Sequence, residues 1–307
     1  MAGTLFSGFL EAVVRSATPL GFAAVGELVA ERSGVINIGL EGSIACGALT
    51  AFVAAQAAGP EAGFIAGGLA GVGVALLFAF FVLALRAQQV VVGAAVSMLG
   101  LGLTSTLNRA LVAGSASVGH VETLPNIRIP LFADIPVLGN ALFSQPLSTY
   151  VLYLVFPLTW WMLYRTIGGL ALRAVGERPA AAVAAGHSPV AIRFAAVLVC
   201  GFLAGLGGAT LVVAQTGMFA DGMSSGRGFV AIAIVALGRW TPAGVAVGAL
   251  VFGAVSALQY LAQSMGWQVP YTLVLASPYV LTLAAMALVR DSRAAPLALS
   301  QPLESRS

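Results

Sequence analysis

Runs of apolar residues fill most of this 307-residue chain, and polar positions gather in short stretches between them. A helix needs about 20 consecutive apolar residues to cross the hydrocarbon core of a bilayer. The runs reach that length and lack the polar face of a helix that packs in water. The pattern predicts an all-α fold, a polytopic transmembrane helical bundle in a single domain at 1–307, with about nine spans at 5–30, 36–58, 62–86, 89–113, 147–165, 191–215, 219–239, 242–263 and 268–290.

Two segments differ from plain spans because glycines and polar residues interrupt them. The first, GELVAERSGVINIGLEG at 26–42, carries these polar side chains: Glu27, Glu31, Arg32, Asn37 and Glu41. The second, DGMSSGRGFVAIAIVALGRW at 221–240, opens with three glycines and an arginine before a short apolar run. Such interruptions in both halves of a chain are typical of the broken helices of transporters. We therefore predict two discontinuous or re-entrant segments, whose irregular backbone must lie against protein or water.

Two loops set the predicted orientation of the chain in the membrane. Residues 114–146 contain several prolines and charges of both signs. Residues 165–193 carry four arginines: Arg165, Arg173, Arg178 and Arg193. Cytoplasmic loops carry an excess of basic residues, so the 165–193 loop is expected inside the cell. Counting spans from it places the 114–146 loop and the N-terminus outside.

The 165–193 loop also predicts a short helix of its own. Pro179 suits the first turn of a helix, and Gly186 suits its end. The residues between them are mostly alanine, a small-residue surface that a partner could approach closely. We expect this helix to dock on a partner subunit in the cytoplasm, with an ordinary loop helix as the alternative.

Composition supports the membrane interpretation and narrows the chemistry. The chain is 59% hydrophobic and 8% charged, with a mean hydropathy of +0.98, whereas soluble domains carry roughly 25% charged residues. All 14 basic residues are arginine. Without lysine there is no G-x-x-x-x-G-K-[ST] phosphate loop, so the chain is not expected to hydrolyse ATP or to be an enzyme. The net charge of +3 comes without a basic patch interleaved with aromatics, so nucleic acid is not an expected partner.

The residues that most often carry metal or redox chemistry are few. Cys46 and Cys200 lie in apolar runs and suit packing. His120 and His187 lie far apart in loops, so we predict no metal site and no catalytic site. The first residues lack a basic region and a small-residue cleavage site, so no removable signal peptide is expected.

Three blocks together resemble the membrane-spanning permease subunits of bacterial ABC importers for nucleosides and simple sugars, in the branched-chain permease superfamily. The blocks are GELVAERSGVINIGLEG at 26–42, LRAVGERPAAAVAAGHSPVAIR at 172–193 and GRGFVAIAIVALGRWTPAGVAVGALVFGAV at 226–255. They follow the family's order, and the resemblance covers almost the whole chain. The first block looks closest to the nucleoside-type permeases, and relatives for ribose, galactose or branched-chain amino acids match it less well.

The resemblance implies a set of partners and a location. It implies a second permease subunit, cytoplasmic ATPase subunits that bind ATP and Mg, and an external solute-binding protein or lipoprotein. The chain itself would lie in the lipid of the bacterial cytoplasmic (inner) membrane and bind no cofactor. The second block resembles the family's coupling loop, which assigns ATPase coupling to Gly176, Glu177, Arg178, Pro179, Ala182 and Gly186. The family pattern favours an aliphatic residue at the position of His187. This departure puts the affinity of the loop for the ATPase partner in doubt.

Asn37 and Glu41 are the first candidates for the solute path. Four residues apart, they share one face if the segment is helical. Ionisable groups at membrane depth are costly and usually face a cavity or a partner group. The two residues therefore line the path, or Glu41 instead caps a helix N-terminus or pairs with Arg32. Glu27 and Arg32 are expected to pair near the cytoplasmic boundary.

The other candidates for the path lie at two further places. Asn108 ends the fourth predicted span, where it is a possible solute contact, and Arg109 is expected to reach the headgroups. Arg227 is expected to hold the second interrupted segment by bonding carbonyl groups, and Phe229 offers a ring to a base, with plain packing as its alternative. The expected function is ATP-driven nucleoside import. A simple-sugar permease and a secondary transporter remain alternatives, although the latter needs an embedded ion site and few carboxylates beyond Glu41 could form one.

Overall fold

The computed structural model describes residues 2–113, 119–130, 133, 135, 138–264, 280–283 and 294–301. Within these residues, seven helices are long and apolar enough to cross a membrane. The elements in chain order are α1 (Ala2–Arg32), α2 (Leu40–Ala58), α3 (Pro60–Ala79), η1 (Phe80–Ala84), α4 (Gln89–Ala113), β1 (Asn126–Arg128), α5 (Leu138–Phe143), β2 (Ser144–Pro146), α6 (Leu147–Arg165), α7 (Ile167–Glu177), α8 (Pro179–Ala184), α9 (Pro189–Leu211), η2 (Val212–Thr216), α10 (Arg227–Leu237) and α11 (Pro242–Ser264).

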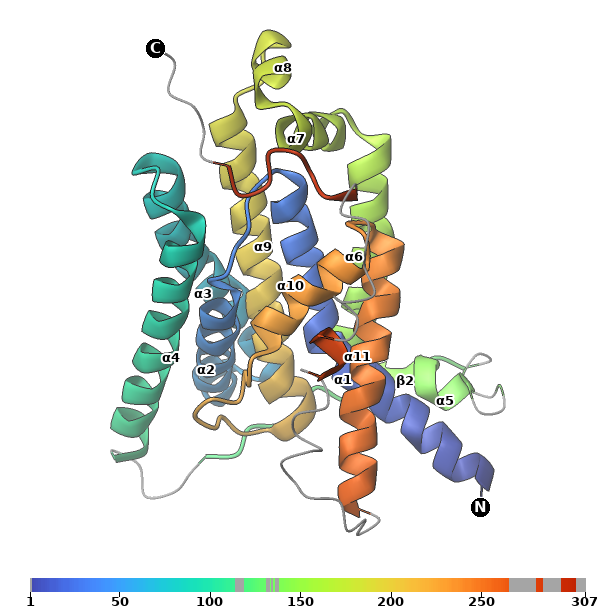
Figure 1. Ribbon diagram of the computed structural model, residues 1–307. Coiled ribbons are helices and arrows are strands. Elements are labelled where there is room, and N and C mark those ends of the chain that lie inside the picture. The colour runs from blue at the N-terminus through green and yellow to red at the C-terminus, as the bar shows by residue number, and fades with distance from the viewer. Residues whose placement is uncertain are drawn as a thin grey trace.

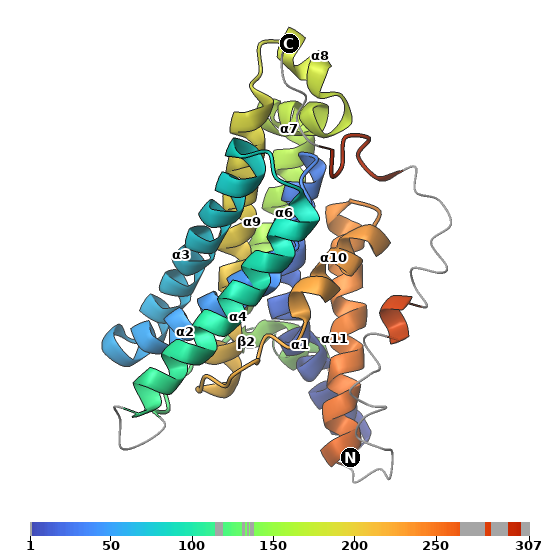
Figure 2. The ribbon, with the colours of Figure 1, turned by 60° about the vertical axis from the view of Figure 1, so that its left-hand side comes forward.

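Helices α1 and α9 form the centre of the bundle, with α3 and α4 on one flank and α11 on the other (Figures 1 and 2). In each central helix 83% of the most apolar stretch is buried, against 33% in α4 and 28% in α6, so the last two face outward. A Cβ at Gly71 of α3 would overlap the carbonyl oxygen of Gly201 of α9, and one at Gly205 would overlap that of Gly67. Glycine is needed there because these backbones touch, as membrane helices rich in small residues often do.

Most of the predicted spans are confirmed as helices, and one is not. The predicted 89–113 and 147–165 coincide with α4 and α6 at both ends, and five others correspond to α1, α2, α3 with η1, α9 with η2, and α11. The predicted span 219–239 is wrong as a full crossing, because it contains only α10, an 11-residue helix. At a rise of about 1.5 Å per residue such a helix covers about half of the roughly 30 Å core. The predicted span 268–290 lies outside the described residues apart from 280–283.

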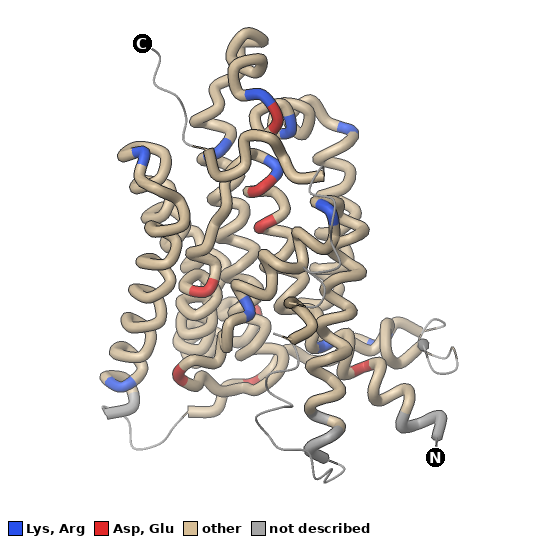
Figure 3. Tube along the Cα trace, in the orientation of Figure 1, with Lys and Arg blue, Asp and Glu red and all other residues tan. Residues whose placement is uncertain are grey.

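The two predicted loops lie at opposite ends of the bundle (Figure 1). The described part of 114–146 contains α5 and a small antiparallel sheet in which Asn126 pairs with Pro146, a minor departure from an all-α fold. The 165–193 loop forms α7 and α8 at the other end, which we call the α7–α8 end. Basic residues gather at this end, as Figure 3 shows. The arrangement agrees with the separation of the two loops that the sequence predicts.

A C-terminal strap, residues 294–301, also lies at the α7–α8 end. Its Ala298 N–H donates to the carbonyl oxygen of Gly176 at 2.9 Å, and its Ser300 N–H donates to that of Gly34 at 3.2 Å. The strap thus joins the end of α7 to the segment that follows α1.

Candidate functional site

The first interrupted segment is a break between α1 and α2. Helix α1 ends at Arg32, residues 33–39 are not helical, and Gly34 has a φ of +92° that favours glycine. Side chains hold the irregular backbone: Glu27 accepts from the Asn37 N–H at 2.9 Å, and Gln89 accepts from the Ile36 N–H at 2.9 Å. We call residues 33–39 the first break.

Asn37 lies inside the first break, so the prediction that it shares a helix face with Glu41 is wrong. Its side-chain oxygen accepts from the Gly39 N–H at 3.0 Å, and its amide nitrogen lies 3.5 Å from the Cys200 sulfur. Only 1% of Asn37 is exposed. In this conformation its amide group holds the turn that leads into α2.

The second interrupted segment, predicted at 221–240, contains the short helix α10, and the non-helical residues 217–226 that precede this helix are called the second break. Gly217, Gly222, Ser225 and Gly226 all have positive φ, so the chain turns repeatedly here. The guanidinium of Arg227 donates to the carbonyl oxygens of Met223 at 2.7 Å and Ser224 at 3.2 Å, as predicted for it. Phe229 is half exposed on α10.

Glu41 joins the two interrupted segments. Its carboxylate accepts from the Gly226 N–H at 2.8 Å and from the Gly228 N–H at 2.7 Å, and only 3% of the residue is exposed. It therefore caps the N-terminus of α10, where free N–H groups and the helix dipole favour a negative charge. A helix cap is one of the alternatives to a path-lining role that the sequence left open for Glu41. The other alternative, an ion pair between Glu41 and Arg32, is not formed between these two described residues. The N-termini of α2 and α10 meet at this carboxylate.

Sequence reasoning missed two residues at the second break. Asn108 donates to Asp221 at 2.9 Å, Ser105 donates to it at 3.1 Å, and the Arg109 guanidinium lies 4.0 Å away. Asp221 therefore ties the end of α4 to the second break, and an acidic residue at the start of a Gly-rich stretch was its only sequence signal. The Ser224 hydroxyl is buried and has no hydrogen-bond partner among the described residues.

Helix α7 contacts the end of α1, and α8 packs on α7 and α9. A Cβ at Gly176 would overlap the carbonyl oxygen of Arg32, so only glycine allows this approach. Glu177 lies 4.0 Å from the Arg32 guanidinium, and Arg178 separates α7 from α8. Helix α8 begins at Pro179 as predicted, and Gly186 beyond it has a φ of +83°.

Ala182 does not belong to the exposed surface predicted for this helix. It is 1% exposed, whereas Ala180, Ala181, Ala184 and Ala185 are exposed. A short helix that rests on its neighbours must bury one side, and a run of alanines does not reveal which side that is. The exposed side of this region therefore carries the other four alanines, and Ala182 packs inward.

A polar chain connects the end of α1 with the residues after α10. Arg32 donates to the carbonyl oxygen of Trp240 at 2.8 Å, and the Trp240 ring N–H donates to the buried Glu31. The predicted Glu27–Arg32 pair is wrong, because Glu27 holds the first break and Arg32 contacts Trp240 and Glu177. Trp240 and Glu31 are 209 positions apart, so no local pattern could have paired them.

Cavities in the described residues lie at two further places, one of them beside the first break, where Gln89 is part of its lining. One of about 320 Å³ lies among α2, α3 and α4 and is mainly apolar, and one of about 180 Å³ lies near Arg86 and Arg193. In the part of the chain that the structure describes, no three His, Cys, Asp or Glu side chains gather as metal ligands. Neither cavity is lined by the residues predicted for the solute path.

Comparison with known proteins identifies the class. Residues 9–288 match the family described as branched-chain amino acid transport system / permease component, and the chain belongs to this family. It is therefore a transport component rather than a catalyst, and a multi-pass protein of the inner membrane.

Three relatives are similar over most of their length. A guanosine ABC transporter permease of Bacillus subtilis, NupQ, is 34% identical over 92% of both chains. A nucleoside ABC transporter permease of Lactococcus lactis, NupC, is 32% identical over 92% of both chains. A putative glucose ABC transporter permease of Haloferax volcanii, TsgC13, is 37% identical over 84% of this chain and 79% of its own. No solved structure matches the chain.

Proposed function

We propose that this chain is the permease subunit of an ATP-driven ABC importer that moves nucleosides across the cytoplasmic membrane. The observation that carries the proposal is the similarity to the guanosine and nucleoside permeases, which extends over 92% of this chain and of each relative. A match over that length includes both breaks, α7 and α8.

A simple sugar is the second candidate solute. The putative glucose permease is 37% identical to this chain, a higher identity over a shorter stretch. A nucleoside contains a sugar ring, so the two solutes share hydroxyl groups that the same polar side chains could bind. A nucleoside adds a base, for which the half-exposed ring of Phe229 offers a stacking surface.

The energy source is proposed to lie outside this chain. The printed names of the three relatives describe ABC transporter permeases, and this chain has no lysine to form a phosphate loop. We propose that ATP and Mg bind to a cytoplasmic ATPase subunit, that a second permease completes the channel, and that an external solute-binding protein or lipoprotein delivers the solute. These relatives make a secondary transporter the less favoured alternative.

The contacts at the α7–α8 end suggest how such an ATPase would act on the solute path. A partner that pulls on α8 would move α7, whose Gly176 touches the backbone of Arg32. Arg32 in turn bonds the carbonyl oxygen of Trp240, just after α10. Movement of α7 would therefore reach the ends of both interrupted segments, at Arg32 and at Trp240. The proposal places the α7–α8 end in the cytoplasm.

Nine crossings are proposed, with the two breaks inside discontinuous spans. Helix α10 is too short to cross alone, and the second break leads up to it from the end opposite α7 and α8 (Figure 1). Helix α11 ends at that opposite end, whereas the C-terminal strap lies at the α7–α8 end. An odd number of crossings also suits a C-terminal strap that lies at the end opposite the start of α1.

The solute path is proposed to pass the junction of α2 and α10. Glu41 shapes this junction, Arg227 holds its backbone, and the Ser224 hydroxyl offers a buried hydrogen-bonding group that nothing in the described residues occupies. Asn37 would act by fixing the start of α2, and Asn108 by holding Asp221 at the second break.

The solute is tested by uptake in cells that express the whole operon. Labelled guanosine and labelled glucose are offered separately, and each is then challenged with an excess of the other unlabelled compound. Guanosine uptake that excess glucose does not reduce supports the nucleoside assignment. Glucose uptake that guanosine does not reduce would replace nucleosides with sugars and leave the permease assignment in place.

The coupling role is tested with Gly186→Val. A β-branched residue is strained at a φ of +83°, so the end of α8 should shift although no neighbour lies within 4 Å. We expect loss of solute-stimulated ATP hydrolysis in the complex, with normal amounts of permease in the membrane. The matched control is Gly102→Val, because Gly102 also has open space around it and lies in the regular helix α4. Wild-type hydrolysis by Gly186→Val would make α8 an ordinary loop helix.

A further inference from the structure

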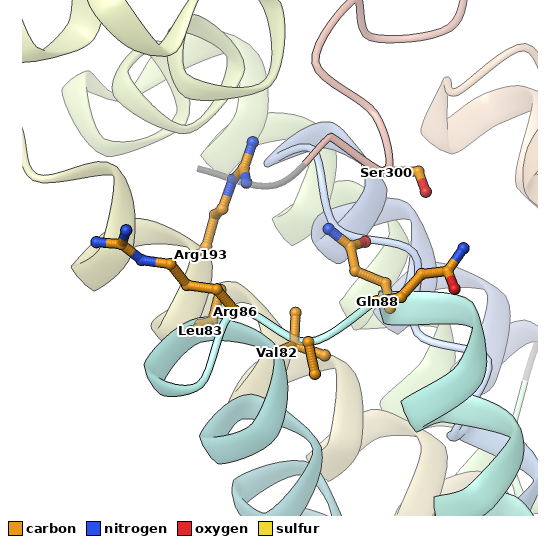
Figure 4. A pocket seen from close by; sticks show the side chains of 8 residues that line it. Val82, Leu83, Arg86, Gln88, Arg193 and Ser300 are labelled. Atoms are coloured by element: carbon orange, nitrogen blue, oxygen red, sulfur yellow. The ribbon is translucent and has the colours of Figure 1, made fainter. Parts of the chain in front are cut away.

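A small cavity lined by both polar and apolar side chains opens at the α7–α8 end, where η1 leads into α4 and the C-terminal strap crosses α9. It holds about 180 Å³, which is the volume of about six waters at roughly 30 Å³ each in the liquid and leaves room for a tetrahedral phosphate. Figure 4 shows Arg193, Gln88 and Ser300 around a common space. The polar lining is Arg86, Gln88, Gln89, Arg193 and Ser300, and no carboxylate takes part in it.

Arg193 is a buried cation beside this cavity. It is 1% exposed, and its two described side-chain bonds go to the carbonyl oxygens of Ser33 at 3.1 Å and Gln301 at 3.1 Å. Both acceptors are neutral, and no described carboxylate forms an ion pair with Arg193. Buried charges are costly unless a counter-charge accompanies them. The cavity therefore offers an anion the place of the missing counter-charge.

Other groups around the cavity are also suited to an anion. Helix α4 begins at Gln89, and a helix N-terminus carries partial positive charge on its free N–H groups. The Gln89 side-chain oxygen accepts from the Ile36 N–H at 2.9 Å, so its NH₂ end is the part left to face another acceptor. Arg86 also lines the cavity and is exposed, although its guanidinium points away from Gln88 and Ser300 in Figure 4.

The surroundings bring the cavity close to lipid. Leu77, Phe80, Phe81 and Leu85 on α3 and η1 and just beyond are 37% to 57% exposed, as expected for a surface that faces acyl chains. Arg86 follows directly, at the position where basic side chains reach the headgroups. Arginine binds phosphate oxygens through parallel N–H bonds, and basic pockets between membrane helices hold lipid headgroups.

We propose that this cavity binds a phosphate-bearing anion, either the headgroup of an anionic lipid or free phosphate. The bound phosphate would neutralise Arg193 and lie between the start of α4 and Ser300 of the strap. It would thus help to hold the strap against α9.

The test uses the full-length protein with two probes in separate arms. In one arm, native mass spectrometry counts phosphatidylglycerol retained by the detergent-purified protein, with phosphatidylcholine for comparison. In the other, calorimetry measures the binding of inorganic phosphate to protein in phosphatidylcholine alone. The variants are Arg86→Gln and Gln88→Glu, both at exposed positions, and Arg165→Gln is the control at the same end of the bundle.

The expected result is binding in one arm that Arg86→Gln weakens about five-fold and Gln88→Glu weakens further, with Arg165→Gln unchanged. Retention of phosphatidylglycerol assigns a headgroup, and binding of inorganic phosphate assigns the free ion. Arg193→Gln should lose binding in the same arm. If Arg193→Gln does not fold, the exposed variant Gln88→Glu decides the test. Absence of binding in both arms, or equal binding by wild type, Arg86→Gln and Gln88→Glu, overturns the proposal.

Discussion

The two breaks differ in what holds their backbone. Buried side chains from α1 and α4 hold the first break, through the bonds that Glu27 and Gln89 accept. The second break depends on its own turns, such as the Ser225 N–H to the Gly222 oxygen at 2.9 Å, and on the Glu41 carboxylate at its end. Its other side-chain tie, from α4 to Asp221, is exposed. Most residues of the first break are buried, whereas most of the second are exposed or partly exposed.

This difference indicates which half of the junction can move. Segments with few buried contacts and exposed backbone open at lower free energy than buried ones. We therefore expect the second break and α10 to be the moving side of the solute path, and the first break to be its fixed side. Glu41 belongs to the fixed side and holds the moving one through two hydrogen bonds.

The largest effect is expected from Glu41→Gln. The variant replaces a carboxylate that accepts two backbone N–H bonds with an amide that can accept with one oxygen only. Hydrogen bonds to charged groups contribute about 1.5–3 kcal/mol each to stability, so we expect the free energy of unfolding to fall by about 3 kcal/mol. Thermal unfolding of the purified protein measures the loss, and hydrogen exchange at Gly228 should quicken.

Glu61→Gln is the matched control, because Glu61 also lies in the first turn of a helix but is exposed. It should unfold like the wild type. Equal stability of Glu41→Gln and the wild type would mean that the carboxylate does not hold α10.

A smaller effect is expected from Asn37→Ala in the first break. The variant removes the acceptor of the Gly39 N–H and leaves that buried donor without a partner, which costs roughly 1–3 kcal/mol. Hydrogen exchange should quicken at Gly39 while exchange within the second break stays unchanged. Faster exchange in both breaks would show that they open together, and the contrast between a fixed and a moving side would fail.

The smallest effect is expected from Asp221→Asn in the second break. Its ion pair with Arg109 spans 4.0 Å between side chains that are 40% and 80% exposed, and exposed pairs contribute about 0–1 kcal/mol. Thermal unfolding should shift little, and high salt should remove the remaining difference. A loss as large as that of Glu41→Gln would show that the second break is held as firmly as the first.

The sequence predicted the plain spans well because hydropathy alone determines them. The ends of α4 and α6 coincide with the predicted ends, since each run stops at a loop or an arginine. The interruption of both segments was also predictable, because glycine and charged residues stand where an unbroken span would need apolar ones.

The contacts between the breaks were beyond sequence reasoning. Glu41 bonds Gly226 and Gly228, which are 185 and 187 positions away, and their approach depends on how the whole bundle packs. The length of the span at 219–239 was overestimated mainly at its start, because residues 219–226 belong to the turns of the second break, where Gly222, Ser225 and Gly226 have positive φ. Uniform alanines likewise hid which face of α8 is buried.

The central claim, ATP-driven nucleoside transport through this permease, is tested most directly by reconstitution. Proteoliposomes receive the whole complex with its solute-binding protein, and uptake of labelled guanosine is followed with ATP supplied to the ATPase subunits, without ATP, or with an ion gradient alone. The account predicts uptake with ATP only, and little uptake when Glu41→Gln replaces the wild-type permease. Guanosine uptake driven by an ion gradient without ATP would contradict it.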